Sequence, residues 1–445
     1  MEKLKYEKPV ISKITAGVPS KFGLPARQKI ISEIDGIPVS KLMEEYGSPV
    51  FVFSENTIRN TYAEARQAFE TRYPKVQFAW SYKTNYLDAV CNIFHDEGSW
   101  AEVVSGFEFE KALAIGVSGS QILFNGPEKS EKDLTLAINH NACIHIDHFD
   151  ELYLLMEITR KLDKKARVAI RVNMDTGIYP MWDRFGFNYE NGEAWNAINR
   201  IMLADRLELI GLHTHIGTYI MAPSAYAIAA TKLANLLVAT HSKFGHWLKY
   251  IDLGGGFASK NTLKGAYMPG SETCPTFDDY AEAITNALIS SEIPHENLPT
   301  LFLETGRALI DDAGYLLTTV LANKRSSTGR RNMVIDAGVN LLFTSFWYNL
   351  GVYPSKPPSE YLEETTIYGP LCMNIDVIRD AINFPHVKTG DQLVIERVGA
   401  YNVTQWMQFI TYRPNVVLID LEGRSHVIKK KEDLETLKNR EVKPE

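Results

Sequence analysis

The sequence lacks long apolar runs. Within its 445 residues, no stretch approaches the roughly 18 uninterrupted apolar residues that a membrane-spanning helix requires. The opening segment, MEKLKYEKPVISK, also has no apolar core of signal-peptide length. These two absences predict a soluble, cytoplasmic protein that does not bind a membrane.

Cysteine is scarce, and basic residues do not cluster. The sequence has four cysteines without any C-x-x-C spacing, at positions Cys91, Cys143, Cys274 and Cys372. Such scattered cysteines argue against a zinc site and against a disulfide framework. The formal net charge is -7, with basic and acidic residues mixed along the chain, so the basic patch that binds a phosphate backbone is not expected. Nucleic acid is therefore not an expected partner.

Apolar residues are abundant, at 45% of the chain. A chain of this length is too long for one ordinary core, which predicts two domains. Between residues 50 and 310, short apolar runs alternate with segments of helical period, a pattern typical of repeated βα units. Eight runs are expected to be strands: Val76–Tyr82, Trp100–Ser105, Gln121–Gly126, Cys143–His148, Arg167–Asn173, Leu209–Gly217, Tyr250–Gly256 and Thr300–Gly306.

Helical segments are expected in the gaps between these strands, at 85–97, 107–115, 151–162, 225–243 and 277–288. Eight βα units predict an α/β fold, a closed (β/α)8 TIM barrel, in which chemistry occurs at the C-terminal ends of the strands. Beyond residue 310, short alternating strands separated by turn residues predict an antiparallel β domain. The predicted division is a barrel over 48–308 and a β domain formed by 1–47 together with 309–445.

Lys83, in SYKTN, directly follows the first strand of the barrel. It is either a surface lysine at a strand end or a functional amine at the mouth of the barrel. A lysine in a partly desolvated pocket loses its proton readily and can form a Schiff base with a carbonyl cofactor.

Two glycine-containing strand ends suit a phosphate group. DLGGG (252–256) ends the seventh strand and ETGR (304–307) ends the eighth, the two positions where barrels often bind phosphate. Glycines let backbone N–H groups approach an anion closely, and an arginine adds a guanidinium. Tight turns use the same glycines, so their place on strands seven and eight is what favours the phosphate site.

HTHIGT (213–218) ends the sixth strand, and its alternation places His213 and His215 on one face with Thr218 at the rim. Two histidines at this spacing are candidates for metal ligation, but no third ligand falls at a convincing distance along the sequence. A ring stacked on a flat cofactor explains the pair equally well. Glu304 is a candidate partner for a pyridinium nitrogen, with a strand-end salt bridge as the alternative.

Taken in order, SYKTN, SGFE, HTHIGT, DLGGGF, ETGR, YGPLC and GAY resemble the motifs of the alanine-racemase-like decarboxylases that use pyridoxal 5'-phosphate (PLP). This is the family of the diaminopimelate and ornithine decarboxylases. The resemblance runs from Phe51 to Tyr401 and implies a PLP-dependent carboxy-lyase with the barrel and β domain predicted above. A chance match of seven motifs in one order is improbable.

The resemblance also implies roles for individual residues. Lys83 would form the Schiff base, His215 would stack on the pyridine ring, and Glu304 would pair with the ring nitrogen. Arg171 would lie near the cofactor's hydroxyl group. The phosphate would be bound by Thr218, Gly255, Gly256, Gly306, Arg307 and Tyr401. Residues implied to contact substrate are Arg307, Tyr348, Cys372 and Met373.

Cys372, in GPLC, resembles the cysteine that in this family reaches in from the partner subunit and returns a proton after carbon dioxide leaves. This implies a two-fold homodimer with shared active sites, the commonest oligomer geometry. Without the resemblance, a buried structural thiol would explain Cys372 as well.

The sequence departs from the family pattern in three places, one of them a pair of residues. Thr344 and Ser345 stand where diaminopimelate decarboxylases carry an Arg-Pro pair, and Met373 stands where an acid receives the substrate's distal ammonium. A thioether cannot neutralise an ammonium, and an unpaired desolvated charge costs a few kcal/mol or more. The third change, Glu102 in place of aspartate, is conservative.

These departures favour a specialised substrate, a modified, conjugated or carrier-bound amino acid of the kind used in siderophore or antibiotic assembly. Three alternatives stand beside it. One is meso-diaminopimelate decarboxylation in lysine biosynthesis. A racemase is disfavoured because those enzymes use a tyrosine base where this chain offers Cys372. A non-catalytic PLP-binding regulator would not need Lys83, Glu304, Arg307 and Cys372 together.

Overall fold

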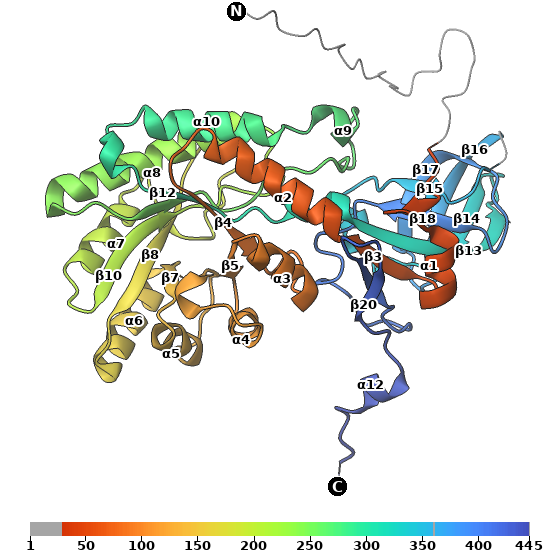
Figure 1. The fold of residues 1–445 in the computed structure, drawn as a ribbon, viewed down its shortest axis with the longest axis horizontal. Coiled ribbons are helices and arrows are strands. Elements are labelled where there is room, and N and C mark those ends of the chain that lie inside the picture. The colour runs from red at the N-terminus through yellow and green to blue at the C-terminus, as the bar shows by residue number, and fades with distance from the viewer. Residues whose placement is uncertain (1–28, 359–360, 445) are drawn as a thin grey trace, which may run out of the picture.

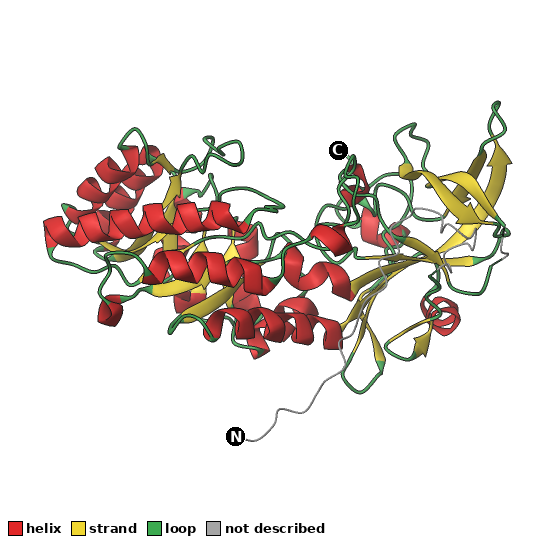
Figure 2. Ribbon diagram, turned by 90° about the horizontal axis from the view of Figure 1, so that it is seen from above, coloured by secondary structure: helices red, strands yellow, loops and turns green. Residues whose placement is uncertain are grey.

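The computed structural model describes residues 29–358 and 361–444 and places them in two parts, seen side by side in Figure 1. One is a ring of helices around parallel strands, and the other is a twisted sheet with few helices (Figure 2). Residues 1–28, which belong to the predicted β domain, lie outside the described residues. None of the described helices combines the length and the apolar character needed to cross a bilayer.

The first part is a closed barrel of eight parallel strands. Hydrogen bonds between β12 and β4 and between β8 and β10 close the ring. This confirms the predicted (β/α)8 barrel. The strands are β4 (Val76–Ser81), β5 (Trp100–Val103), β6 (Ile122–Phe124), β7 (Cys143–Ile146), β8 (Ala166–Asn173), β10 (Leu207–His213), β11 (Tyr250–Asp252) and β12 (Thr300–Leu303), with a short β9 (Phe187–Asn188) beside β8.

Several strands end earlier than the apolar pattern predicts. The residues after His213, Asp252 and Leu303 were expected to continue their strands, but they form turns. Gly254 and Gly256 adopt φ of +65° and +98°, in the left-handed region that a strand cannot contain. The motif residues therefore lie on loops above the barrel mouth rather than on its strands.

Helices pack around the outside of the barrel (Figures 1 and 2). The five expected helical segments correspond to α3, α4, α6, α8 and α10. Several helices start at an oxygen that caps the first turn, such as the hydroxyls of Ser54, Ser105 and Thr276. The helices of this part are α2 (Glu55–Glu70), α3 (Asp88–Asp96), α4 (Gly106–Ala114), η1 (Gly119–Gln121), α5 (Glu131–Asn139), α6 (Phe149–Leu162), α7 (Glu193–Met202), α8 (Pro223–Phe244), α9 (Gly270–Thr273), α10 (Phe277–Ile289), η2 (His295–Asn297), α11 (Arg307–Ile310) and η3 (Asp311–Ala313).

The second part is a nine-stranded, mostly antiparallel sheet, as expected, in which only β14–β16 and β3–β19 pair in parallel. Its strands are β3 (Val50–Ser54), β13 (Gly314–Arg325), β14 (Arg331–Ile335), β15 (Val352–Pro354), β16 (Leu362–Tyr368), β17 (Val377–Pro385), β18 (Gln392–Glu396), β19 (Val416–Ile419) and β20 (Ser425–Lys429). The smaller elements are β1 (Glu33–Ile34), β2 (Ile37–Pro38), α1 (Val39–Tyr46), η4 (Phe343–Phe346) and α12 (Leu434–Lys438). The division at residue 48 stays a prediction, and β3, which lies inside the predicted barrel range, pairs with β13 and β19 of this sheet.

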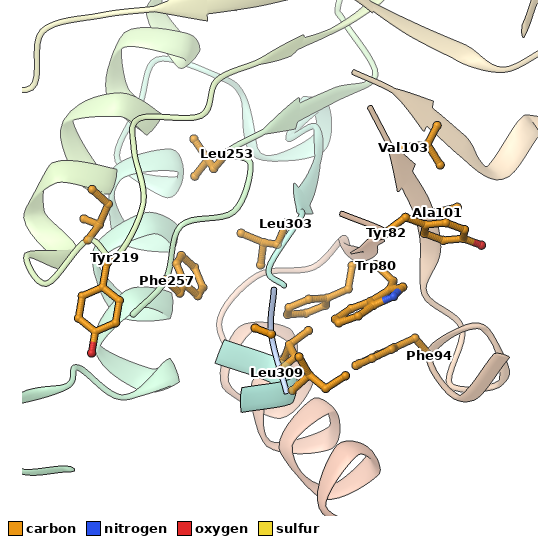
Figure 3. Packing of buried hydrophobic residues seen from close by; sticks show 14 of the residues in the cluster. Trp80, Tyr82, Phe94, Ala101, Val103, Tyr219, Leu253, Phe257, Leu303 and Leu309 are labelled. Carbon is orange, nitrogen blue, oxygen red and sulfur yellow. The ribbon is translucent and has the colours of Figure 1, made fainter. Parts of the chain in front are cut away.

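Aromatic packing holds the turn after β4 in place. The indole of Trp80 stacks on Phe94 of α3 at 3.8 Å between ring centroids, next to Tyr82 and Leu309 (Figure 3). The indole N–H donates to the carbonyl of Asn85 at 3.1 Å. Because burying aromatic side chains of this size supplies much of the core's stability, Lys83 is carried on a rigid turn.

A segment of the β domain is hydrogen-bonded to the same turn. The Tyr401 N–H donates to the Thr84 carbonyl at 2.9 Å, and the Thr404 hydroxyl donates to the Lys83 carbonyl at 2.9 Å. Tyr401 adopts φ of +63°, a strained conformation for a residue other than glycine and one that concentrates at functional sites. The GAY motif, about 320 residues from Lys83 in sequence, is thereby placed beside it.

Candidate active site

All ten predicted cofactor-binding residues line two adjoining cavities at the barrel mouth. The first, of about 270 Å³, includes the side chains of Lys83, Arg171, His215 and Glu304. The second, of about 120 Å³, is lined by Lys83, His215, Thr218, Gly255, Gly256, Glu304, Gly306, Arg307 and Tyr401, among others. Their shared walls make them one continuous site. A larger cleft of about 490 Å³ beside residues 349–353 contains none of the predicted site residues.

Lys83 is paired with Glu102, which β5 places beneath it. Its Nζ lies 3.1 Å from both carboxylate oxygens, and Glu102 is fully buried. Burial lowers the pKa of Lys83, but the negative charge of Glu102, followed by Tyr401 and Glu304, outweighs burial and raises that pKa above the ordinary value. Desolvation alone would make the amine lose its proton more readily, but the carboxylate partner, which the sequence does not reveal, acts in the opposite direction.

Glu102→Gln is expected to move cofactor loading to lower pH. A lysine reacts as the free amine, which exists above its pKa. Removing the carboxylate removes the largest influence that raises this pKa, so the pH midpoint of loading should fall by about one unit or more. The measurement is the pH dependence of the visible absorption of the protein with added PLP. Glu110→Gln, which removes an exposed acid paired with Lys132, should leave the midpoint unchanged; an unshifted midpoint in Glu102→Gln would show that Glu102 does not control Lys83.

His215 presents a flat ring to the cavity. Its imidazole is parallel to the indole of Trp182, with 5.5 Å between centroids and 6° between planes. Burial lowers the pKa of His215 well below the ordinary value, so the ring is neutral at neutral pH and suited to stacking on a flat group. Trp182 lines both cavities. No sequence motif marks Trp182. Its position in the loop that follows β8, the strand of Arg171, was the only sequence feature that pointed to it.

The smaller cavity has the form of an anion cup. A side chain at Gly256 would place its Cβ 2.2 Å from the Gly217 carbonyl oxygen, and one at Gly306 would place it 2.1 Å from the Thr84 hydroxyl oxygen. These positions accept glycine alone, which leaves their backbone N–H groups open to an anion. Thr218, at the rim, is exposed.

Arg307 supplies the positive charge of this cup. It is 7% exposed, and its Nη1 has no hydrogen-bond partner among the described residues. The guanidinium lies over the rings of Tyr401 and Tyr348, at 4.6 and 5.1 Å from their centroids. A buried guanidinium with an unused donor fits a phosphate oxygen.

Glu304 lies buried between the two cavities. One carboxylate oxygen, Oε1, accepts a hydrogen bond of 2.6 Å from the Asn125 amide, and the other, Oε2, has no partner that meets hydrogen-bond geometry. Asn125 also donates to Glu102 at 3.0 Å, so one amide orients both acids. Asn125 was missed because it follows β6, where no motif marks it.

His213 and His215 both line the larger cavity, as their predicted common face requires, but their neighbours differ. His213 is completely buried against His145, Asp252 and Glu304, whereas His215 faces Trp182. The sequence around His213 contains no third ligand because His145, Asp252 and Glu304 come from other strands. Only closure of the barrel brings them together.

Only some of the predicted substrate-binding residues lie at the two cavities. Tyr348 is buried against Arg307 at the edge of the smaller cavity. Cys372 is exposed, Met373 is half-buried, and neither lines the two cavities of the described chain. Their loop is held by the Asp376 carboxylate, which accepts hydrogen bonds of 2.7 Å from the N–H groups of Val339 and Leu371.

Thr344 is not exposed to the cavities either. It is buried, and its N–H and hydroxyl both donate to the side-chain oxygen of Asn402, at 3.2 and 3.0 Å. Asn402 follows Tyr401, so Thr344 supports the GAY turn. In this chain the position therefore has a structural role where the family pattern has an arginine.

The site fits PLP on its own geometry. An amine, a neutral flat imidazole, a buried carboxylate and a glycine-lined cup with a guanidinium match the aldehyde, ring, ring nitrogen and phosphate of that molecule. A closed parallel barrel with this set at its C-terminal mouth defines the class of PLP enzymes built on a (β/α)8 barrel.

Comparisons with known proteins agree. Residues 56–311 match the model of the family described as "Pyridoxal-dependent decarboxylase, pyridoxal binding domain". Diaminopimelate decarboxylase of Bacillus subtilis is 28% identical over 419 residues, covering 91% of this chain and 94% of the relative. The enzyme of Methanocaldococcus jannaschii is 30% identical over 408 residues, covering 88% and 90%.

Solved structures show the same relationship. The crystal structure of the M. jannaschii diaminopimelate decarboxylase has a TM-score of 0.86 at 28% identity and covers 94% of this chain and 98% of its own. Lysine/ornithine decarboxylase of Vibrio vulnificus has a TM-score of 0.73 at 19% identity, over 86% and 97% of the two chains, which shows the shared fold. The chain belongs to the pyridoxal-dependent decarboxylase family, and the predicted family, the PLP cofactor and the carboxy-lyase class are confirmed.

Proposed function

We propose that this enzyme decarboxylates meso-diaminopimelate. The observation that carries the proposal is the similarity, over about nine-tenths of the chain, to proteins named diaminopimelate decarboxylase. The departures at Thr344, Ser345 and Met373 had instead favoured a modified or carrier-bound substrate, with this reaction as an alternative. The comparisons favour this alternative, and nothing in them supports a siderophore or antibiotic role.

Each site residue has a separate role in binding the cofactor at the reacting end of the substrate. PLP, when bound, withdraws electrons from the carbon that loses carbon dioxide. Lys83 supplies the amine that holds the cofactor, and Glu102 lies within reach to accept its proton. His215 would support one face of the cofactor ring, and Glu304 would pair with the ring nitrogen. The glycine cup and Arg307 fix the phosphate, so that orientation does not depend on the substrate.

The two positions at which the family pattern binds the distal end of the substrate are changed in this chain. Thr344 is buried and engaged with Asn402, and Met373 carries no charge. If the substrate is diaminopimelate, other groups must bind its distal ammonium and carboxylate, because leaving them unpaired in a desolvated site would cost several kcal/mol. This observation favours, as the second candidate, an amino acid whose distal end is uncharged.

Carbon dioxide release by the PLP-loaded enzyme tests the proposal. The substrates are meso-diaminopimelate, lysine, ornithine, arginine and glutamate derivatives of both configurations. Rapid turnover of meso-diaminopimelate alone supports the proposal. The absence of turnover, from a protein whose Lys83 is nevertheless fixed to PLP by borohydride, overturns it and supports the second candidate.

Met373→Glu, which restores the acid of the family pattern, separates the two candidates further. A charged distal ammonium would gain a partner, so the KM for meso-diaminopimelate should fall by about tenfold. An unchanged KM would show that the ammonium is bound elsewhere. Met373→Gln, similar in size but uncharged, is the matched control.

We also propose that the active enzyme is a two-fold homodimer whose sites each take Cys372 from the partner subunit. Within the described chain Cys372 lines neither cavity, and its side chain is exposed. Large apolar side chains are exposed on segments next to the site residues: Phe346 and Trp347 before Tyr348, and Ile375 after Met373. Exposed apolar side chains of this kind are typical of an interface.

Mixing two inactive variants is expected to restore activity. Dimers that combine one Lys83→Ala chain with one Cys372→Ala chain contain one intact shared site in two. Random exchange would therefore yield about a quarter of wild-type activity. The measurement is carbon dioxide release after subunit exchange in dilute denaturant, with each variant alone as control. Activity that never rises above the separate variants would contradict a shared site.

A further inference from the structure

Four polar side chains meet in the core beneath the barrel mouth. Each is at most 2% exposed: His145 at the end of β7, His213 ending β10, Asp252 ending β11 and Glu304 after β12. One nitrogen or carboxylate oxygen atom from each of the four lies within 4.8 Å of the corresponding atoms of the other three. The cofactor roles implied by the family resemblance use only Glu304, which leaves the other three without an assigned task.

The two carboxylates each have one oxygen without a partner. Asp252 Oδ1 accepts a hydrogen bond of 2.8 Å from the Gly254 N–H, and Glu304 Oε1 accepts one of 2.6 Å from Asn125. Asp252 Oδ2 and Glu304 Oε2 have none among the described residues. Two buried carboxylates this close cannot both be ionised without a large electrostatic cost, and a proton shared between them removes it.

The surrounding groups do not neutralise both acids. His213 Nε2 lies 3.4 Å from Glu304 Oε2, and His145 Nε2 lies 2.7 Å from the Tyr250 hydroxyl. Burial lowers the pKa of both histidines well below the ordinary value, so neither adds positive charge. The other charged groups facing the cluster are already engaged: Lys83 with Glu102, Arg171 beside Asp147 and Lys129 with Glu151.

We propose that Asp252 is a positioning residue that carries a proton and donates it to Glu304 Oε2. Glu304 thus stays the charged member of the pair, with its carboxylate held between Asn125 on one oxygen and Asp252 on the other. Burial, followed by the charge of Glu304, raises the pKa of Asp252 well above the ordinary value, in agreement with this assignment. The role of Asp252 in catalysis rests on the proposed function, in which Glu304 contacts the ring nitrogen. The proton shared between Asp252 and Glu304 is independent of that function.

The proposal predicts which substitution the site tolerates. An asparagine at 252 keeps an oxygen for the Gly254 N–H and an NH2 donor for Glu304, so it reproduces a protonated aspartic acid. Asp252→Ala removes the donor and leaves Glu304 Oε2 unpaired. Asp252→Asn should therefore bind PLP within about threefold of the wild type, and Asp252→Ala at least about tenfold more weakly.

Two measurements test the proposal. The infrared spectrum of the full-length protein at neutral pH, recorded with PLP bound and after its removal, should contain a carboxylic acid C=O band that is missing from the spectrum of Asp252→Asn. PLP titrations followed by visible absorption should give the predicted order of affinities, and the pH dependence of the absorption should be preserved in Asp252→Asn but shifted in Asp252→Ala.

Three results would overturn the proposal. They are a spectrum without the acid band, an Asp252→Asn variant as impaired as Asp252→Ala, and one equivalent of a divalent metal ion in the purified protein, bound in place of the proton. The infrared band is measured in PLP-free protein as well, so it still tests the protonation of Asp252 if the proposed substrate is wrong. It also decides the question if Asp252→Ala fails to fold.

Discussion

Lys83→Ala is expected to abolish carbon dioxide release, by about three orders of magnitude or more, and to release PLP from the protein. Lys83 is the only lysine lining the two cavities of the described chain, and no neighbouring amine can replace the covalent attachment that anchors the cofactor. The measurements are carbon dioxide release with meso-diaminopimelate and the mass of the protein after borohydride treatment.

The matched control is Lys132→Ala, which removes an exposed lysine paired with Glu110 and should leave both measurements unchanged. A Lys83→Ala protein that still carries PLP covalently after borohydride would show that a different lysine holds the cofactor. In that case the assignment of the barrel mouth would be wrong even though the family is right.

Gly256→Ala is expected to weaken PLP binding by about a hundredfold or more. The added Cβ would lie 2.2 Å from the Gly217 carbonyl oxygen and 2.9 Å from the Tyr226 hydroxyl oxygen, and φ is +98°. The Gly217 backbone and the Tyr226 side chain would have to move, which opens the cup whose N–H groups would face the phosphate. The measurement is PLP affinity by visible absorption, with the free energy of unfolding measured alongside.

Gly265→Ala is the matched control, because its φ of +82° is similar but its Cβ would meet nothing within 4 Å. It carries the same backbone strain, about 1–2 kcal/mol, without the clash, so its PLP affinity should remain that of the wild type. Equal losses of affinity in both variants would attribute the effect to backbone strain and not to the shape of the cup.

The fold could be predicted because its signals are local. Each barrel strand is a short apolar run and each helix has a 3.6-residue period, so both can be recognised within a window of about ten residues. The exceptions have two causes, one local and one long-range. Strands were predicted too long at Thr214 and Leu253 because their apolar and β-forming residues continue past the point where the chain turns. β3 was counted with the barrel range, and its pairing with β13 depends on residues more than 260 positions away.

The cofactor residues could be predicted because they lie in ordered motifs at strand ends, which a barrel brings to one face. Trp182, Asn125 and His145 could not, because they belong to no motif. The effect of the site on the pKa of Lys83 could not be predicted for a related reason. Its burial could be anticipated from position, but the pKa depends on the placement of Glu102 within 3.1 Å.

The sequence by itself determined the barrel, the cofactor and the reaction class, because the periodicity of apolar residues and the order of the motifs are properties of the sequence alone. Only the tertiary structure decided which side chains share a charge or a proton. Glu102 with Lys83, and Asp252 with Glu304, are pairs formed across strands, and electrostatic interactions between buried groups depend on separations of a few ångströms. That Cys372 does not line the cavities of its own chain likewise could be seen only in the tertiary structure, because closure of the barrel and packing of the β domain decide which loops border the site.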